Sequence, residues 1–260
     1  MDRWSKAALL LVGHGSSLRP EGRAATVRLA EAIRRRGIFA EVQECFCKEP
    51  PYPSLDLASA RLIYVVPNFA GVGNYTNRLI PQRLGLTGRV TIRAGRRVVY
   101  CDPVGSHPGV ATLLQRRAEE LCRTAGASTT ATALLVIGHG ARSGDAGRTP
   151  EAVAAALRAS GRFAEVATAF IEQEPRVAQW PRLVRATQVI AAPLLISEGM
   201  HANEDLPPLF GLSTPIGGPI ALSGRTVWLM GGLGRDPEVV EMILDLVRAA
   251  DSTMLETEPP

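Results

Sequence analysis

The sequence has no long apolar run, and this absence argues against a membrane-spanning protein. No stretch approaches the eighteen or more uninterrupted apolar residues of a membrane-spanning helix, so we expect no membrane partner. The first residues also lack the small-residue cleavage signal of a secretory leader, which predicts a cytoplasmic protein. With 46% apolar and 21% charged residues, the composition is typical of a globular chain, and 260 residues suit two domains of ordinary size.

Cysteine is scarce. None of the four cysteines forms a C-x-x-C pair, and a disulfide framework is unexpected in a chain of this size. Cys45 and Cys47 alternate along a predicted strand and would share one face of a sheet. A soft-metal site is one interpretation of this pair. We favour free thiols, because unpaired cysteine often packs as a small apolar side chain.

Lysine is almost absent: of the 29 basic residues, only Lys6 and Lys48 are lysines, and the others are arginines. Residues 1–128 carry 19 Lys and Arg against 10 Asp and Glu, a net charge of +9, whereas residues 129–260 carry 10 against 15, a net charge of −5. Planar guanidinium groups pair well with carboxylates and phosphates. An anionic small molecule is therefore one interpretation of the basic half, and composition bias with a solvated surface is the other. The basic residues are dispersed and no nucleic-acid module is present, so we expect no nucleic-acid partner.

What the chain does contain is an internal repeat. Residues 8–15 recur as residues 133–140, so that an apolar run leads into Gly-His-Gly in both halves, and residues 67–86 align without a gap on residues 193–212. Tyr75 stands in the first copy where His201 stands in the second. The repeat predicts two domains, residues 1–128 and residues 129–260, of which only the second keeps a pair of histidines.

Short apolar runs alternate with amphipathic segments in each half. In the first copy we expect strands near residues 7–12, 40–46, 62–66 and 98–101, and a helix that ends at Gly37. In the second copy Thr149 is the expected cap of a helix that Gly161 closes, and the last helix of each half should begin at Pro108 and Pro237. This alternation predicts two similar α/β domains with parallel sheets, right-handed crossovers and flavodoxin-like layering.

Candidate site residues follow the predicted strands of the second half. In parallel sheets ligands bind beyond the carboxyl ends of the strands, where His139, His201 and Glu172 are expected to lie. Two imidazoles and a carboxylate suit a divalent transition metal, although Glu174 is an alternative to Glu172. Lys48 stands near the position of Glu172 in the first copy, which loses the carboxylate as well.

The role of His14 stays open. Because its expected partner is Tyr75, we favour a structural remnant or an outer contact over a second metal centre.

The two histidine motifs carry a family resemblance. Gly-His-Gly after a strand, and Met-His-Ala-Asn-Glu-Asp-Leu-Pro at residues 200–207, resemble the motifs of the CbiX and sirohydrochlorin chelatase family of class II chelatases. The resemblance implies two α/β domains around a cleft and a lyase that inserts Co²⁺ or Fe²⁺ into sirohydrochlorin, on the route to cobalamin or sirohaem. It places metal-binding histidines at His139 and His201 and a supporting carboxylate at Glu172.

The implied partners are an anionic tetrapyrrole and a divalent metal ion that is a substrate, and a homodimer stays open. No nucleotide is expected, because no G-x-x-x-x-G-K sequence is present. A histidine phosphatase would need Arg before the histidine, where both copies have Gly. A non-catalytic tetrapyrrole or metal carrier on the same fold is an alternative, and insertion of nickel into a related ring is another.

Overall fold

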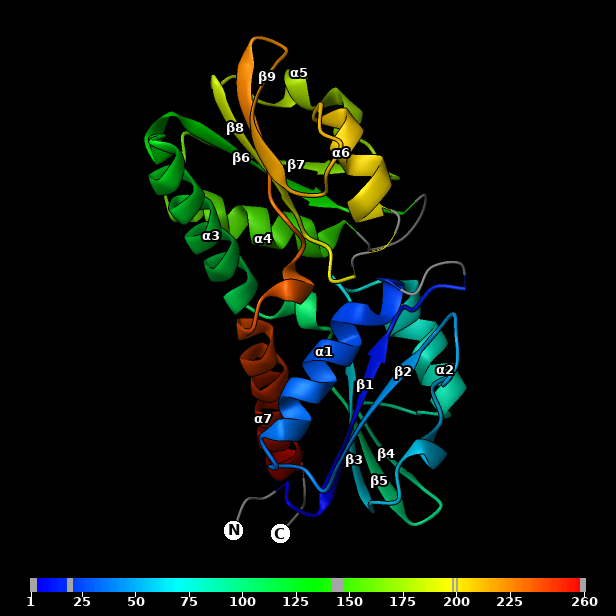
Figure 1. The fold of residues 1–260 in the computed structure, drawn as a ribbon. Helices are drawn as coiled ribbons and strands as arrows, with labels where there is room; N and C mark the ends of the chain where they lie inside the picture. The colour runs from blue at the N-terminus through cyan, green and yellow to red at the C-terminus, as the bar shows by residue number, and fades with distance from the viewer. Residues whose placement is uncertain (1–3, 18–20, 142–146, 198, 200, 258–260) are drawn as a thin grey trace. The chain divides into compact units, whose positions relative to one another are not determined.

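Two compact units make up the chain in a computed structural model that describes residues 4–17, 21–141, 147–197, 199 and 201–257. The first unit comprises Met1–His107 and Asp236–Pro260, and the second comprises Pro108–Arg235. Each unit is built on a five-stranded sheet with helices packed on it (Figure 1).

The first unit has the strand order β2-β1-β3-β5-β4, with β1, β2, β3 and β5 parallel and β4 antiparallel to β5. Its strands are β1 (Ala7–Gly13), β2 (Glu41–Phe46), β3 (Leu62–Pro67), β4 (Val90–Arg93) and β5 (Arg96–Tyr100). Its helices are α1 (Glu21–Arg35), α2 (Ile80–Leu84) and α7 (Glu238–Thr257), with a π-helix at Tyr75–Leu79 and 3₁₀ turns at Leu55–Leu57 and Val104–Ser106.

The second unit repeats this topology with the order β7-β6-β8-β10-β9. Its strands are β6 (Thr132–Gly138), β7 (Glu165–Phe170), β8 (Gln188–Pro193), β9 (Gly217–Leu222) and β10 (Arg225–Leu229). Its helices are α3 (Gly109–Ala125), α4 (Arg148–Ala159), α5 (Trp180–Leu183) and α6 (Leu206–Leu209), with a π-helix at His201–Asp205 and 3₁₀ turns at Thr129–Ala131, Val177–Gln179 and Leu233–Arg235.

The predicted α/β class is confirmed, with one difference at the edge of each sheet. The sheets are mixed, because β4 and β9 run antiparallel to the neighbouring β5 and β10. Ala94 and Gly95 join β4 to β5 with φ of 51° and 72°, and Ser223 and Gly224 join β9 to β10 with φ of 53° and 71°. Two residues with positive φ form the tight turn that suits the twist of a hairpin. The sequence reading missed both hairpins because Ala-Gly and Ser-Gly are weaker turn signals than Asn-Gly or Asp-Gly.

The compact units do not follow the predicted division at residue 128. Helix α3 ends the first sequence repeat but packs on α4 and β8 of the second unit, and α7 ends the second repeat but packs on α1 and β3 of the first unit. The buried residues of α3 form an apolar stripe that only a sheet or helix partner can cover, and the second unit provides it. The predicted division into residues 1–128 and 129–260 follows the sequence repeat, and the compact units differ from it by the exchange of these two final helices.

Helix α7 is anchored by a buried carboxylate. Asp251 is 5% exposed, and its Oδ2 accepts a hydrogen bond of 2.8 Å from the Trp4 indole N–H, while its Oδ1 accepts one from the Tyr64 hydroxyl. A buried carboxylate needs such donors, because an unpaired one costs several kcal/mol. These bonds tie α7 to β3 and to the start of the chain.

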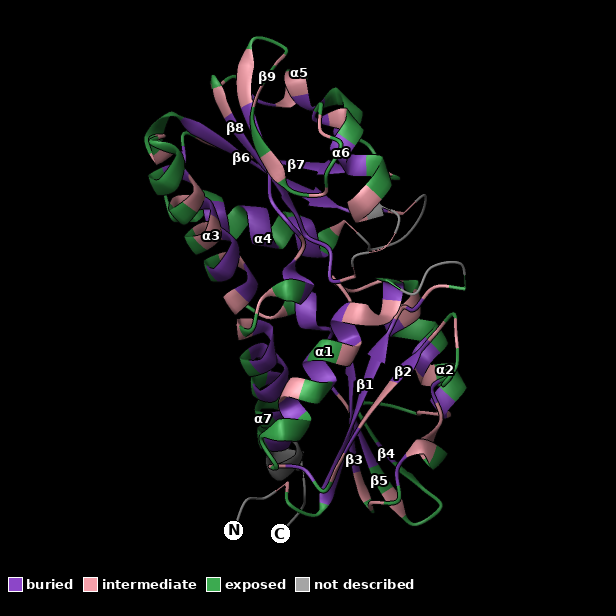
Figure 2. Ribbon diagram, in the orientation of Figure 1, coloured by how far each residue is buried: buried purple, intermediate pink, exposed green. Residues whose placement is uncertain are grey.

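The central strands are buried on both faces, which explains why they read as continuous apolar runs. Figure 2 shows the buried strands lying between helices whose outer faces are exposed. The start of α4 differs from the prediction, since the helix begins at Arg148 and Thr149 is buried within it without capping it. Within the described ranges, no helix has the length and apolar character that a bilayer crossing requires.

Candidate metal site and its counterpart in the first unit

His139 lies just beyond β6, at the carboxyl edge of the second sheet. A Cβ at Gly138 would lie 2.5 Å from Pro150 Cγ and 3.0 Å from Phe170 Cδ1, so only glycine fits before the histidine. Gly140 has φ of 73°, the left-handed conformation that lets the chain turn back after it. The Gly-His-Gly sequence thus presents an exposed imidazole on a tightly fixed turn.

The imidazole of His139 is oriented by the backbone. Its Nδ1 lies 2.8 Å from the carbonyl oxygen of Gly140. Because a carbonyl oxygen only accepts, Nδ1 carries the proton, and the neutral ring then has its lone pair on Nε2. A hydrogen bond from one ring nitrogen that fixes the tautomer is typical of histidines that bind metal through the other nitrogen.

Glu172 is held beside His139 through the main chain. Its N–H donates to the carbonyl oxygen of His139 at 2.9 Å, and its side chain is exposed. Glu174 is also exposed, but its carboxylate accepts from the Arg176 N–H at 3.2 Å and lies 3.6 Å from the Arg176 guanidinium. The structure therefore brings the backbones of His139 and Glu172 together, and engages Glu174 with Arg176.

His201 is the first residue of the π-helix His201–Asp205, and its side chain lies outside the part of the chain that the structure describes. The predicted pairing of His139 with His201 thus stays a prediction. Among the described residues, no group of three or more His, Cys, Asp or Glu side chains is arranged to hold a metal ion.

The same turns recur in the first unit with different side chains. His14 Nδ1 lies 3.0 Å from the carbonyl oxygen of Gly15, and the His14 carbonyl accepts from the Lys48 N–H at 3.0 Å, as His139 accepts from Glu172. The rings of His14 and Tyr75 meet edge to face with 4.9 Å between their centroids. Phe69 completes the group, 5.7 Å from Tyr75 and 6.0 Å from His14.

A π-helix positions Tyr75. Such helices are rare and occur often at functional sites. The π-helix Tyr75–Leu79 is held by the Tyr100 hydroxyl, which donates to the Thr76 carbonyl at 2.7 Å, and by the Thr76 hydroxyl oxygen, which accepts from the Gly73 N–H at 2.9 Å. The sequence reading found Tyr75 as a departure from the repeat but missed its aromatic contacts with His14 and Phe69. These contacts depend on the path of the π-helix, for which the sequence gives no simple signal.

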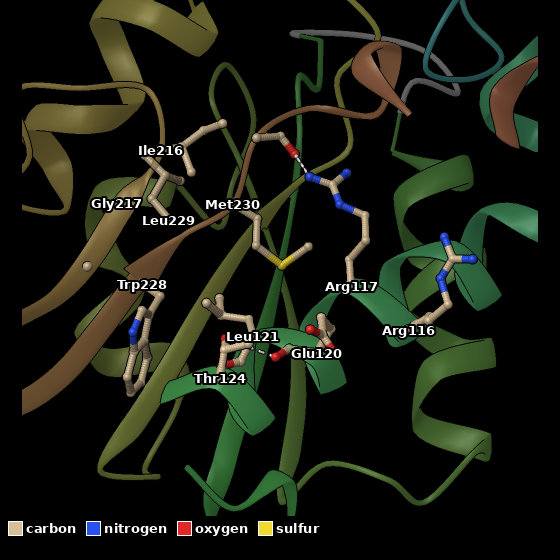
Figure 3. Close-up of a pocket in the computed structure, with 12 residues that line it drawn as sticks. Arg116, Arg117, Glu120, Leu121, Thr124, Ile216, Gly217, Trp228, Leu229 and Met230 are labelled. Atoms are coloured by element: carbon tan, nitrogen blue, oxygen red, sulfur yellow. Dashed lines mark hydrogen bonds between the residues drawn. The ribbon is translucent and has the colours of Figure 1, made fainter. Parts of the chain in front are cut away.

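Two pockets lie within the units. One, of about 450 Å³, lies in the first unit and includes Tyr75 in its lining. The other, of about 710 Å³, lies in the second unit between α3 and the β9–β10 hairpin, where Arg117 donates to the Gly231 carbonyl at 2.7 Å (Figure 3). This larger pocket is lined mostly by apolar side chains such as Trp228 and Met230, and none of the predicted site residues is among its lining.

The cysteines agree with the prediction of free thiols. All four are free thiols, and Cys45, Cys101 and Cys122 are buried. Burial raises the pKa of the Cys45 thiol above its usual range, and raises that of Cys47 to about 11. Thiols that stay protonated are poor metal ligands, because the thiolate is the form that binds.

Comparison with known proteins identifies the family. The family described as CbiX matches residues 8–121 and residues 133–250, one match in each repeat. The chain belongs to the CbiX family. Both halves of this CbiX-family protein match separately, so the internal repeat is a repeat of the family unit itself.

Relatives of known name agree with this assignment. A probable sirohydrochlorin cobaltochelatase from Halobacterium salinarum is 30% identical, over 94% of this chain and 91% of its own. A sirohydrochlorin cobaltochelatase from Methanococcus aeolicus is 29% identical over 43% of this chain and 97% of its own length. A single repeat of the CbiX-family chain therefore corresponds to nearly all of that shorter relative.

Solved structures show the same fold. DR2241 from Deinococcus radiodurans, described as a multi-domain protein with structural similarity to chelatases, superposes with a TM-score of 0.76 at 31% identity. The match covers 93% of this chain and 54% of DR2241, so the chain spans about half the length of that protein. SirB from Bacillus subtilis, solved with Fe³⁺, gives a TM-score of 0.71 at 19% identity over 97% of this chain and 98% of its own, a likeness of fold.

Proposed function

We propose that this CbiX-family protein inserts a divalent metal ion, cobalt or iron, into sirohydrochlorin. His139 and His201 bind the incoming ion, and Glu172 adds negative charge beside it. The ion is a substrate. It enters the ring as two pyrrolic N–H protons leave, so the two positive charges of the ion replace those of the two released protons. The names of the relatives from Halobacterium salinarum and Methanococcus aeolicus support the substrate.

The observation that carries the proposal is the 4.9 Å separation of the His14 and Tyr75 rings. In the repeat, His14 corresponds to His139 and Tyr75 to His201, and Tyr75 and His201 both begin a π-helix. When two imidazoles bind the same tetrahedral ion at about 2.1 Å, their ligating nitrogens lie roughly 3.4 Å apart. Ring centroids about 5 Å apart are compatible with that distance.

The backbone turns before the two π-helices support the correspondence. The Asn77 N–H donates to the Gly73 carbonyl at 2.8 Å, and the Asn203 N–H donates to the Gly199 carbonyl at 3.2 Å. Equivalent hydrogen bonds place the first residue of each π-helix at an equivalent point of the loop after the third strand. His201 follows β8 in the chain and His139 follows β6, and β8 and β6 are neighbours in the sheet, which supports the pairing of the two histidines.

The His139 tautomer supports its assigned role. With Nδ1 donating to the Gly140 carbonyl, Nε2 has the lone pair that binds an ion or accepts one pyrrolic proton. The second proton leaves to solvent or to a carboxylate at the same edge. Glu172 suits that position better than Glu174, because its backbone is bonded to His139 whereas Glu174 pairs with Arg176.

The test uses purified protein with sirohydrochlorin and Co²⁺, Fe²⁺ or Ni²⁺ in separate reactions, followed by the change in ring absorption. We expect many turnovers with cobalt or iron, and a drop of at least a hundredfold in rate for His139→Ala and for His201→Tyr, which copies the first unit. His107→Ala is the control variant, because the His107 ring lies 3.9 Å from Asp245 and belongs to neither proposed site, and it should keep most of the activity.

Binding of one ring per chain without acceleration would indicate a carrier instead, and fastest turnover with Ni²⁺ would overturn the choice of metal. Equal activity of His139→Ala and His107→Ala would contradict the assigned ligands.

A further inference from the structure

The pocket of about 450 Å³ in the first unit has an unusual lining for its place in the fold. It lies between the turn after β2, the π-helix and α2. The lining residues are Cys47, Pro53, Tyr75, Leu79, Ile80, Gln82 and Arg83. Because Tyr75 belongs both to this pocket and to the aromatic cluster of His14, Phe69 and Tyr75, the pocket and the cluster adjoin.

The second unit fills the equivalent place with hydrocarbon. Ile171 corresponds to Cys47, since both donate their N–H to the carbonyl of the glycine before the site histidine, at 3.1 Å and 3.0 Å. Leu209 corresponds to Arg83 in the gap-free alignment of residues 67–86 on residues 193–212. Ile171 and Leu209 both pack against the buried core of the second unit. The fold therefore does not require a thiol and a guanidinium at these two positions.

Arg83 is placed to bind an anion. Its guanidinium carbon lies 4.5 Å from the centre of the Tyr52 ring, and its Nη1 lies 3.5 Å from the Cys47 carbonyl oxygen. The face of an aromatic ring attracts a guanidinium, and a guanidinium held in this way can still form a two-pronged contact with a carboxylate. The contact with Tyr52 holds Arg83 at the pocket, and none of the seven lining residues is acidic.

The other polar groups of the pocket are donors at neutral pH. Burial raises the pKa of the Tyr75 phenol and that of the Cys47 thiol, so both keep their protons. Gln82 adds an amide, and Arg83 adds the only formal charge in the lining. A pocket with a cation, neutral donors and no anion matches a carboxylate.

We propose that this pocket binds a carboxylate arm of the tetrapyrrole, with the ring edge against the aromatic cluster of His14, Phe69 and Tyr75. Arg83 forms the charged contact, and Gln82 and Tyr75 donate to the same group. This inference rests on the proposed function, because it takes sirohydrochlorin as the ligand. It assigns the first copy of the repeat, which lacks the second histidine, a role in recognising the substrate.

The experiment measures binding of metal-free sirohydrochlorin to the full chain by fluorescence titration, so that no chelation is needed. Arg83→Gln should weaken binding about tenfold, equivalent to about 1.4 kcal/mol. Arg61→Gln is the matched control. Arg61 is an exposed arginine directly before β3, at the amino end of this strand, whereas Tyr75 of the pocket follows the carboxyl end. It should bind within about twofold of the unaltered protein.

A second variant separates loss of recognition from loss of folding. Cys47→Ile with Arg83→Leu copies the packing of the second unit, so it should fold, close the pocket and weaken ring binding at least as much as Arg83→Gln. In steady-state assays both pocket variants should raise KM. Equal affinity of Arg83→Gln and Arg61→Gln, in a protein that still metallates the ring, would overturn this inference alone. Failure of the unaltered protein to bind or metallate sirohydrochlorin would instead overturn the proposed function.

Alkylation of Cys47 distinguishes an arm of the ring from a free small carboxylate. Iodoacetamide at pH 9 should label Cys47 more slowly when sirohydrochlorin is present, and this protection should disappear in Arg83→Gln. Protection by acetate alone, with none by sirohydrochlorin, would show that the pocket takes free carboxylates and would contradict the assignment to the tetrapyrrole.

Discussion

The imidazole of His14 meets the phenol ring of Tyr75 edge to face, with 4.9 Å between the two ring centroids. The two residues come from separate elements, the turn after β1 and the start of a π-helix after β3. The first unit therefore has a phenol at the position where the second unit has His201, one of the two proposed metal ligands. Burial raises the pKa of that phenol, so at neutral pH it stays protonated and is a poor ligand for a metal ion.

Replacing this phenol with an imidazole should create a second metal site. We expect Tyr75→His to bind two Co²⁺ ions per chain and the unaltered protein to bind one, because His14 would gain a nitrogen partner at the observed distance. Isothermal titration calorimetry with Co²⁺ gives the stoichiometry. Tyr75→Phe is the control and should bind one ion. A single ion in Tyr75→His would mean that the proximity of the two rings is not sufficient for a site.

A methyl group at Gly138 should destabilise the second unit. The added Cβ would lie 2.5 Å from Pro150 Cγ and 3.0 Å from the Phe170 ring, and overpacking of this kind costs about 1–3 kcal/mol. Urea denaturation of Gly138→Ala should show a lower midpoint, with the loss confined to the transition of the second unit. Gly88→Ala, at an exposed bend where the added Cβ would lie 3.9 Å from the Val90 carbonyl oxygen, should unfold like the unaltered protein. An unchanged midpoint for Gly138→Ala would refute the packing argument.

The exchanged final helices predict which fragments fold. Residues 108–235 contain the whole second sheet with α3 and α4 and should give a cooperative thermal transition. Residues 129–260 lack α3 and carry α7 without the sheet on which it packs, so they should expose apolar surface and bind the dye ANS. Circular dichroism and ANS fluorescence compare the two fragments. A cooperative transition for residues 129–260 alone, with none for residues 108–235, would contradict the division into units.

The thiol of Cys47 should react slowly near neutral pH. Burial raises its pKa to about 11, so at pH 8 its thiolate fraction is roughly a hundredfold below that of an ordinary cysteine. Alkylation followed by peptide mass spectrometry should show the rate at Cys47 rising through pH 11. A rate that levels off near pH 8.5 would show an ordinary thiol.

Linkage gives the matching prediction for stability. Between about pH 9 and pH 11 the unfolded chain releases the Cys47 proton and the folded chain retains it, so stability falls as the pH rises through this range. Cys47→Ala should flatten that part of the stability profile, measured by urea denaturation at a series of pH values. Cys47→Ala with an unchanged slope would indicate that another group causes the loss.

The turn around His139 was accessible from the sequence because its determinants are local. Gly138 and Gly140 are required by a close contact and by a positive φ on either side of His139, so the Gly-His-Gly sequence marks the turn directly. The backbone bond between His139 and Glu172 follows from the parallel pairing of β6 and β7. The aromatic cluster around His14 was not predicted, since it depends on the path of a π-helix that has no simple sequence pattern.

The sequence by itself determined the two repeated α/β halves, because strands buried on both faces must be continuously apolar and each is followed by its own turn glycines. It also determined which copy keeps two histidines. Only the tertiary structure decided where α3 and α7 pack, since an apolar stripe shows that a helix is buried without specifying the sheet that covers it. Likewise, the pocket at Arg83 exists because three separate segments meet there, and no one of them shows it alone.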